Sequence, residues 1–482
     1  MADATNSSLL IEGREVPAEG GQCFDVISPW SGQVIGTAAR GTRADVDAAV
    51  ASARRGFARW AGLASAQREQ VLLKAADIIA SEGEARFLDT LIDESGSTIN
   101  KARGEIAYSV DLLRTAAGES RRLYGDTFPN DRADRLSLVL REPLGVVAVL
   151  APYNAPLSLT VKMSAFPLAA GNAVVLKPSE ETPLTAVEFA RVLAEAGLPD
   201  GVINVVTGFP DECGRPLVGH ASVDCVALTG STATGVAVGR EAIGRMQRMQ
   251  LELGGKSAIV VLRDADPADA ARIVADGMFA HAGQICMANS RIIAEAPVFD
   301  AFAAALKARL ESLQVGDPRD EASAYGPLIN RRALEKVQAH QREALERGAT
   351  LLTGGAVCEG LVYQPTVLVE PPRDCALWRD ESFGPIASLV RAADFDAAIE
   401  LANDSDYGLS AAVLTHDVRK AFAAVRRIRA GAVHIGMHAF QSNALAPIGG
   451  LGMSGIGRSG GRYSTEEFTE LKWVSVELEG AA

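Results

Sequence analysis

The segment HAGQICMAN, residues 281–289, contains a single cysteine, Cys286, whose role its neighbours leave open. A cysteine can be a small buried hydrophobe, a metal ligand or a nucleophile. The six cysteines of the chain form no Cys-x-x-Cys pair, and no histidine stands at metal-ligand spacing, so we expect neither a metal site nor a disulfide framework. His281 lies five residues before Cys286, which is not the spacing of one helix face. A buried thiol and a nucleophile therefore remain the two interpretations.

Two polar residues stand where they could assist a nucleophile. In LELGGKS, residues 251–257, Glu252 lies between leucines, and a carboxylate among apolar neighbours tends toward a raised pKa, which suits a general base. In APYNAP, residues 151–156, Asn154 stands on a stiff loop where its amide could donate to an oxyanion. A glutamate facing water at a helix end and an ordinary turn asparagine are the alternatives.

Two turns could hold a nucleotide. In VVLKPSE, residues 174–180, Lys177 and Glu180 follow an apolar run, and they could bind ribose hydroxyls at the carboxyl end of a strand. Because a carboxylate repels a 2′-phosphate, Glu180 favours NAD over NADP. The turn GSTATG contains Gly230 and Gly235 and precedes a helix, whose N-terminus suits a pyrophosphate. A solvated loop and an ordinary glycine-rich turn are the alternatives.

The chain around these residues alternates short apolar runs with amphipathic segments. Runs of β-branched residues closed by Gly or Pro predict strands, and their continuous apolar character predicts parallel sheets covered on both faces. The expected strands are 144–152, 172–178, 201–208 and 223–230 in a first series, and 256–262, 290–297 and 411–417 in a second. The expected helices are 44–61, 66–82, 84–93, 182–199, 267–283 and 298–313. The predicted fold class is α/β, with two units and a cleft between them.

The tail of the chain, residues 466–480, ends in an alternating strand pattern with no hairpin partner nearby. Such a strand pairs across a subunit interface or with a distant edge, and residues 134–143 are a candidate companion.

Composition narrows the class of protein. The chain has 482 residues and a net charge of −13, so nothing indicates nucleic acid or an anionic membrane as a partner. The N-terminus has no basic segment followed by an apolar one, and no run of about 18 apolar residues occurs, so we expect neither a signal peptide nor a membrane span. Scattered cysteines fit reduced thiols in the cytoplasm.

Taken together, the motifs closely resemble those of the NAD(P)-dependent aldehyde dehydrogenase superfamily. In chain order they are APYNAP, KPSE, the GSTATG turn, ELGGK, GQIC, ESFGPI and PIGGLGMSGIGR. The resemblance implies a variant Rossmann cofactor domain, an α/β catalytic domain and a small β oligomerisation arm, hence a homodimer or homotetramer. The implied boundaries are 1–123 and 143–253 for the cofactor domain, 254–450 for the catalytic domain, and 124–142 with 464–482 for the arm.

The resemblance also implies roles for matching residues. Cys286 would attack the aldehyde carbon, Asn154 would hold the oxyanion, and Glu252 would activate the water that hydrolyses the thioester after hydride transfer to NAD. The implied cofactor contacts are Lys177 and Glu180 at the adenosine ribose, Gly230, Ser231 and Gly235 at the pyrophosphate, and Glu381 and Phe383 at the nicotinamide ribose. No metal is implied.

Within the family, GQICM, GPLIN, GRSGG and EEFTELKWVSV look most like the benzaldehyde, vanillin and salicylaldehyde dehydrogenases. Lys162 falls where that branch often has a basic residue and could meet a ring hydroxyl or carboxyl group, with a surface lysine as the alternative. The other expected substrate contacts are Tyr153, which replaces the usual Trp, Ile285, Met287, His438 and Phe440, the last two with loop packing as the alternative.

Other activities stay open. A short-chain aliphatic or hydroxy-aldehyde would use the same machinery, and a CoA-acylating enzyme of the same fold would lack a base at position 252. A catalytically silent NAD-binding protein and a cysteine hydrolase are further alternatives. The retained Cys286, Glu252 and Asn154 oppose the former, and the nucleotide motifs oppose the latter.

Overall fold

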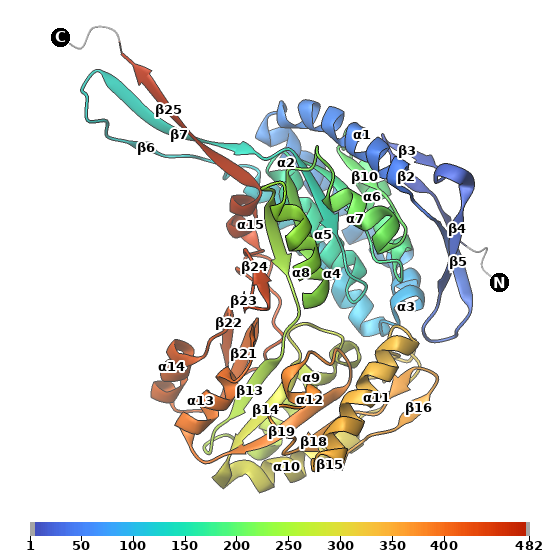
Figure 1. The fold of residues 1–482 in the computed structure, drawn as a ribbon, viewed down its shortest axis with the longest axis vertical. Coiled ribbons are helices and arrows are strands. Elements are labelled where there is room, and N and C mark those ends of the chain that lie inside the picture. Colours follow the sequence, from blue (N-terminus) through green and yellow to red (C-terminus); the bar gives the residue numbers. More distant parts are fainter. Residues whose placement is uncertain (1–4, 479–482) are drawn as a thin grey trace.

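A computed structural model describes residues 5–478 of the chain. Two twisted sheets, each covered by helices, lie one above the other in Figure 1, and a narrow β arm extends from the upper one. The expected mixed α/β architecture with parallel sheets is confirmed. Residues 1–4 and 479–482 of the predicted N-terminal and C-terminal segments lie outside the described residues.

The first sheet has eight strands in the order β24-β12-β11-β8-β9-β10-β2-β3. Its five central strands are parallel, and both edges are antiparallel. The strands are β2 (Leu9–Ile11), β3 (Arg14–Val16), β8 (Val146–Leu150), β9 (Ala173–Lys177), β10 (Ile203–Val205), β11 (Cys225–Thr229), β12 (Arg248–Glu252) and β24 (Gly455–Ile456).

Helices cover both faces of this sheet, which explains why its strands are apolar without alternation. Val147 and Val149 of β8 join one core, whereas Val146 and Ala148 join another. The first face is covered by α2 (Ser65–Gly83), α4 (Ile99–Glu119), α5 (Pro156–Ala169) and α6 (Pro183–Glu195), with α3 (Asp89–Ser95) and the π-helical η2 (Glu84–Leu88) beside them. The second is covered by α1 (Arg43–Ala61), α7 (Arg215–Val218) and α8 (Thr232–Ile243), with the π-helical η3 (Pro210–Gly214).

The second sheet has seven strands in the order β15-β18-β19-β14-β13-β21-β22, all parallel except β15. The strands are β13 (Ser257–Val261), β14 (Asn289–Glu295), β15 (Thr350–Thr353), β18 (Thr366–Val369), β19 (Ile386–Ala392), β21 (Ser410–Leu414) and β22 (Ala432–Ile435). Its helices are α9 (Pro267–Phe279), η4 (Ala280–Gly283), α10 (Ala296–Glu311), α11 (Arg331–Glu346), α12 (Ala376–Arg379), α13 (Phe395–Asn403) and α14 (Val418–Arg427).

The arm is a three-stranded antiparallel sheet that stands away from the body in Figure 1. Strand β25 (Thr469–Glu477) pairs along its whole length with β7 (Arg135–Pro143), and β6 (Thr127–Phe128) completes the sheet. The predicted companion of the terminal strand is thus confirmed. Leu471 and Trp473 are 60% and 67% exposed, so the arm presents apolar side chains to its surroundings. Helix α15 (Gly461–Glu467) joins the arm to the body.

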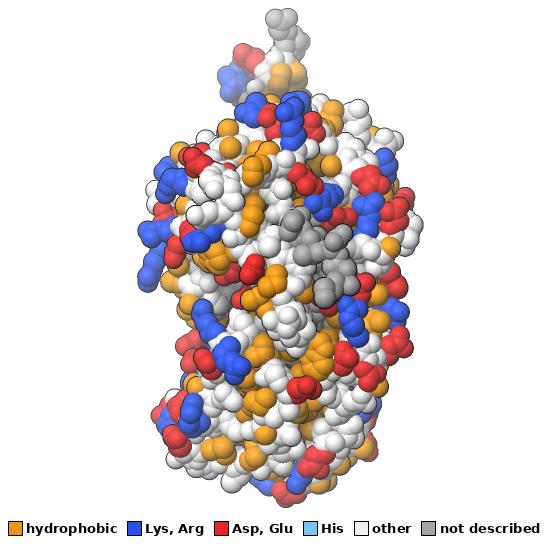
Figure 2. Space-filling view, turned by 90° about the vertical axis from the view of Figure 1, so that its right-hand side faces the viewer, with side chains coloured by type: hydrophobic (Ala, Val, Ile, Leu, Met, Phe, Trp, Pro, Cys, Tyr) orange, Lys and Arg blue, Asp and Glu red, His pale blue; other side chains and the backbone are white. Residues whose placement is uncertain are grey.

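The remaining elements are short. They are β1 (Thr5–Ser7), β4 (Cys23–Ile27) and β5 (Val34–Ala39) in one small sheet, η1 (Glu19–Gly21), the pair β16 (Val357–Glu359) and β17 (Val362–Tyr363), and the pair β20 (Tyr407–Gly408) and β23 (Leu451–Gly452). No helix within residues 5–478 is both long and apolar enough to cross a membrane. On the face shown in Figure 2, acidic and basic side chains are intermixed, without a large area of one sign.

One short link is decisive for the site. Strand β12 of the first sheet ends at Glu252, and β13 of the second begins at Ser257. Only the residues 253–256 join the two sheets here, so Glu252 lies at their junction. Loops that follow the carboxyl ends of parallel strands meet at the same edge of a sheet, which is where ligands of such folds bind.

Candidate active site

The loop that carries Cys286 has an unusual backbone. The predicted helix 267–283 is wrong at its end, because α9 stops at Phe279 and the chain then turns through left-handed conformations at His281 (φ 50°) and Ala282 (φ 55°). Gly283 also has positive φ, and a Cβ there would overlap the backbone carbonyl of Gly384. The space at Gly283 is therefore filled by another loop of the protein. Residues held in sparsely populated conformations are concentrated at functional sites.

Asn154 is hydrogen-bonded directly to the cysteine loop. Its Nδ2 donates to the backbone carbonyl of Gln284 at 2.9 Å. Because a carboxamide nitrogen has two hydrogens, this bond fixes the orientation of the group and leaves one N–H for another acceptor. Gln284 is itself fully buried, and its Oε1 accepts a hydrogen bond from the Ile329 N–H at 2.9 Å. The predicted oxyanion donor and nucleophile are thus parts of one hydrogen-bonded unit.

Glu252 has a carboxylate oxygen without a partner. Its Oε1 is buried and makes no hydrogen bond within the described residues. Burial raises the pKa of Glu252 to about 7, although the positive charges of Lys162 and Arg458 lower it. The interpretation of Glu252 as a solvent-facing residue at a helix end is wrong, since it ends strand β12. A carboxylate with this pKa is half ionised near neutral pH, as a general base should be.

The residues around Cys286 keep its thiol protonated. Burial, together with the negative charges of Glu381 and Glu252, raises the pKa of the thiol to about 12, and Lys162 opposes the shift. A thiol is a much weaker nucleophile than a thiolate. Attack by Cys286 therefore requires a base to take its proton, and the charge on Glu252 shows that this carboxylate is close enough to influence the sulfur.

Lys162 is a buried cation. It lies on α5, is only 7% exposed, and makes no hydrogen bond or ion pair with any described residue. Burial lowers its pKa, whereas the charges of Glu252 and Cys286 raise it. The alternative of a surface lysine is therefore wrong, and Lys162 lies within electrostatic range of the nucleophile and the base.

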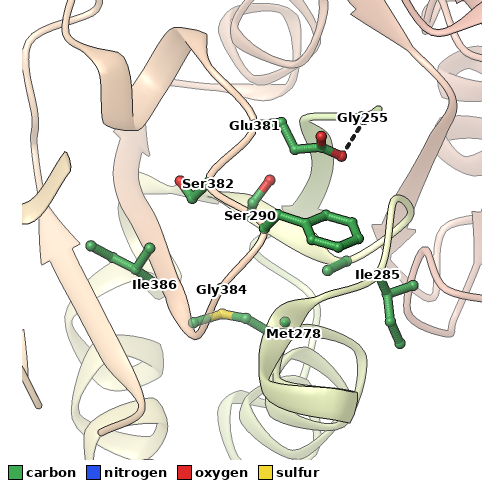
Figure 3. Close-up of a pocket in the computed structure, with 11 residues that line it drawn as sticks. Gly255, Met278, Ile285, Ser290, Glu381, Ser382, Gly384 and Ile386 are labelled. Carbon is green, nitrogen blue, oxygen red and sulfur yellow. Dashed lines mark hydrogen bonds between the residues drawn. The ribbon is translucent and has the colours of Figure 1, made fainter. Parts of the chain in front are cut away.

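The two glycines of ELGGK, Gly254 and Gly255, allow two other segments of the protein to approach the backbone closely. A Cβ on Gly254 would overlap the carboxylate of Glu381, and a Cβ on Gly255 would overlap the backbone carbonyl of Cys286. The Gly255 N–H donates to Glu381 Oε1 at 3.0 Å, the bond drawn dashed in Figure 3. Burial raises the pKa of Glu381, and this N–H lowers it. The carboxylate of Glu381 and the backbone carbonyl of Cys286 thus both lie against this short backbone segment.

A narrow pocket lies beside this segment (Figure 3). Glu381 stands on one side of it, Met278 and Gly384 stand opposite, and Ile285 of the cysteine loop closes another side. Phe383 also lines it and has a left-handed backbone (φ 53°). The Phe383 ring meets the ring of Tyr153 edge-on, with centroids 5.9 Å apart. The predicted Ile285, Glu381 and Phe383 are therefore close neighbours.

The residues predicted to hold the nucleotide follow parallel strands of the first sheet. Lys177 ends β9 and is buried, and its Nζ contacts Glu180 Oε2 at 3.3 Å. Ser231 is the N-cap of α8, where its hydroxyl accepts from the Thr234 N–H. Gly235 has a different reason to be glycine, because a Cβ there would overlap the Leu253 side chain. A Cβ on Gly230 would lie 3.3 Å from the side chain of Leu228. The lysine, the carboxylate and the helix N-terminus together fit a dinucleotide.

The remaining predicted substrate residues lie around the cysteine loop. His438 and Phe440 stack on each other, with ring centroids 6.2 Å apart, in a loop whose Ala439 N–H donates to Asn289 Oδ1. Met287 is buried. None of these three forms a hydrogen bond or ion pair with Cys286 in the described structure, so their role as substrate contacts stays a prediction.

The sequence predicted no role for three buried polar side chains, Lys256, Ser382 and His340, which are connected by short polar contacts next to Glu381. Lys256 Nζ donates to Ser382 Oγ at 3.0 Å, and Ser382 Oγ lies 3.1 Å from His340 Nδ1. Burial lowers the pKa of Lys256 to about 7. The feature of the sequence that could have indicated this role is the position of Lys256 directly before the apolar run SAIVVL. The sequence also predicted no role for Gln284, which lies in the motif GQIC.

The chain is similar to known proteins over nearly its whole length. The profile of the Aldehyde dehydrogenase family matches residues 16–474. A vanillin dehydrogenase of Pseudomonas fluorescens is 39% identical over 97% of both chains. An NADP(+) succinate-semialdehyde dehydrogenase of Escherichia coli (strain K12) is 34% identical over 97% of both chains. The crystal structure of an NAD-dependent aldehyde dehydrogenase from Sinorhizobium meliloti, 38% identical, superposes with a TM-score of 0.96 and covers 99% of this chain and 96% of that one.

Proposed function

We propose, since this chain belongs to the aldehyde dehydrogenase family, that it oxidises an aldehyde to the carboxylic acid with NAD and that Cys286 is the nucleophile. The family and the resemblance to vanillin dehydrogenases agree with the motifs of the sequence. The observation that carries the mechanism is the hydrogen bond from Asn154 to the backbone carbonyl of Gln284, because it joins the proposed oxyanion donor to the loop that carries Cys286.

The residues would act in a defined order. Glu252 takes the proton of the Cys286 thiol as the sulfur attacks the aldehyde carbon, and the free N–H of Asn154 donates to the oxygen that becomes negative. NAD, when bound, supplies the acceptor for the hydride that leaves this carbon. Cys286 then holds the acyl group as a thioester. Glu252 passes the proton that it took from the thiol to solvent and is ionised again. It then takes a proton from the water that attacks the thioester, and it returns this proton to the sulfur, which leaves as the thiol when the acid is released.

We assign cofactor binding to the first sheet and the nucleophile to the second. Lys177 and Glu180 would bind the adenosine ribose, the start of α8 would face the pyrophosphate, and Glu381 would bind the nicotinamide ribose. NAD is favoured over NADP because the Glu180 carboxylate would repel a 2′-phosphate. One relative above uses NADP(+), and the superposed structure is of an NAD-dependent enzyme.

The substrate we propose is an aldehyde that carries an acidic group away from its carbonyl, with an aromatic ring favoured. Lys162 supports this, since a buried cation without a partner is costly unless an anion compensates it. Vanillin has an acidic phenol, and succinate semialdehyde has a carboxylate. The edge-on pair Tyr153 and Phe383 offers aromatic surface nearby, which favours the vanillin type. A short aliphatic semialdehyde is the second candidate, and the same lysine favours it.

The test is NADH production from a panel of benzaldehyde, vanillin, salicylaldehyde, succinate semialdehyde and propanal, with wild type and Lys162→Met. We expect the wild type to prefer an acid-bearing aldehyde. We expect Lys162→Met to lose at least ~10-fold more in kcat/KM for that aldehyde than for benzaldehyde, the scale of one charged contact, because the effect of Lys162 on Glu252 and Cys286 is common to both substrates. Benzaldehyde is the internal control because it lacks an acidic group. Equal losses for benzaldehyde and vanillin would refute the proposed role of Lys162.

Glu252 favours hydrolysis of the thioester over transfer to coenzyme A, since hydrolysis needs a base for water. The same assay with and without coenzyme A decides this point, and a turnover that requires coenzyme A would refute the proposal.

We further propose a homodimer or homotetramer assembled through the arm, in the cytoplasm. The exposed Leu471 and Trp473 support the assembly.

A further inference from the structure

Helix α5, which begins two residues after Asn154, has no capping residue of its own. Its N-cap is Ala155, whose methyl group cannot accept a hydrogen bond, and Pro156 occupies the first helical position. The N–H groups of Leu157 and Ser158 would therefore lack partners at a buried helix end, which is costly. The partner comes from a different helix.

Glu105 of α4 supplies the missing cap. Its Oε1 accepts from the Leu157 N–H at 2.9 Å and from the Ser158 N–H at 3.0 Å. Its other oxygen, Oε2, accepts from Lys101 Nζ at 2.7 Å. The Glu105 side chain is 3% exposed, so this is a buried carboxylate whose charge is paired both with a cation and with the positive end of a helix dipole.

Lys101 extends the same network to the predicted oxyanion donor. Its ammonium group has three hydrogens and three acceptors: Glu105 Oε2, Ser97 Oγ at 2.8 Å and the backbone carbonyl of Asn154 at 2.8 Å. The backbone of Asn154 is thus held by Lys101, the backbone three and four residues later is held by Glu105, and the Asn154 side chain is held by Gln284.

We propose that Lys101 and Glu105 are positioning residues for the oxyanion donor Asn154. They touch neither the nucleophile nor the base, and they act by fixing the backbone on both sides of the asparagine. Reaction rates depend steeply on such placement, since a displacement of about 1 Å can cost on the order of 100-fold. The proposal rests on the proposed function, in which Asn154 stabilises an oxyanion.

The test is a double-mutant cycle between Lys101→Met and Asn154→Ala. We expect Lys101→Met to lower kcat for aldehyde oxidation by ~10-fold to ~100-fold, with an unchanged KM for NAD. In the Asn154→Ala background, we expect the same substitution to change kcat by less than about 2-fold, because the group that it positions is gone. Equal losses in both backgrounds would show a merely structural role and overturn the proposal.

Two additional readouts separate this proposal from the proposed function. Hydrolysis of p-nitrophenyl acetate needs a nucleophile and an oxyanion donor but no NAD or aldehyde, so it should fall in Lys101→Met in parallel with kcat. Alkylation of Cys286 by iodoacetamide forms no oxyanion and should keep its rate. Loss of alkylation together with ester hydrolysis would overturn the proposal. Absence of aldehyde oxidation in the wild type would instead refute the proposed function.

Two matched variants control for a general loss of folding. Glu105→Gln keeps one oxygen for the amides of α5 and removes the charge that pairs with Lys101, so it should fold and show a smaller loss with the same dependence on Asn154. Lys74→Met is the control, because Lys74 also donates to a backbone carbonyl, that of Glu195 at 3.0 Å, but on the surface. An effect of Lys74→Met equal to that of Lys101→Met would contradict the proposal.

Discussion

Replacement of Glu252 by glutamine should separate the two halves of the proposed reaction. The substitution keeps the size of the side chain and removes the base. Formation of the acyl enzyme with release of NADH should also slow, because Glu252 takes the proton of the Cys286 thiol, but it should slow less than hydrolysis, because a thiol is a stronger acid than water. Hydrolysis should fall by about 100-fold to 10,000-fold, the usual contribution of a general base, which corresponds to about 3 to 5 kcal/mol of barrier.

The pKa of Glu252 sets the pH dependence of the wild type. With a pKa of about 7, raised by burial, the carboxylate is protonated below that pH and ionised above it. About a tenth of the enzyme has the base form at pH 6 and about nine-tenths at pH 8, so hydrolysis should decline about 10-fold as the pH falls through this window. Glu252→Gln should lose this dependence.

Rapid mixing of the enzyme with NAD and aldehyde is the appropriate assay. Wild type should give continuous NADH production, whereas Glu252→Gln should give a burst of roughly one NADH per subunit followed by a slow phase. A full steady-state rate in Glu252→Gln, or a wild-type hydrolysis rate that is flat between pH 6 and 8, would refute the assignment of the base and the physical account of its pKa.

Three other predictions test the remaining assignments. Cys286→Ala should abolish NADH production while NAD binding, followed by quenching of protein fluorescence, persists; retained activity would disprove the nucleophile. Glu180→Gln should improve kcat/KM with NADP relative to NAD by ~10-fold or more, because the change removes a repulsive charge and releases Lys177 from its ion pair; an unchanged ratio would place cofactor choice elsewhere. Trp473→Ser should shift the protein toward smaller species in sedimentation experiments, because this 67% exposed ring lies on the arm; an unaltered assembly would argue against the arm.

Local sequence was sufficient for much of the fold. The expected strands 172–178 and 256–262 correspond to β9 and β13, and the expected helix 44–61 corresponds to α1, because buried parallel strands and amphipathic helices leave strong periodic patterns. The end of α9 was predicted wrongly, since its last residues have ordinary helix-forming side chains. The left-handed turn at His281 and Ala282 directly precedes the point where Gly283 packs against the distant loop at Gly384, a contact that the local sequence does not record.

By itself, the sequence determined the family and the α/β class, and it selected Cys286, Glu252 and Asn154 as candidate site residues, because each depends on residue types at short spacing. Only the tertiary structure decided that Lys162 is buried beside the base, that Gly255 is needed for contact with Cys286, and that Glu105 caps the helix after Asn154. These properties join residues that are 31, 52 and 90 positions apart. Burial and electrostatic coupling depend on distances in space, which no local pattern of side chains records.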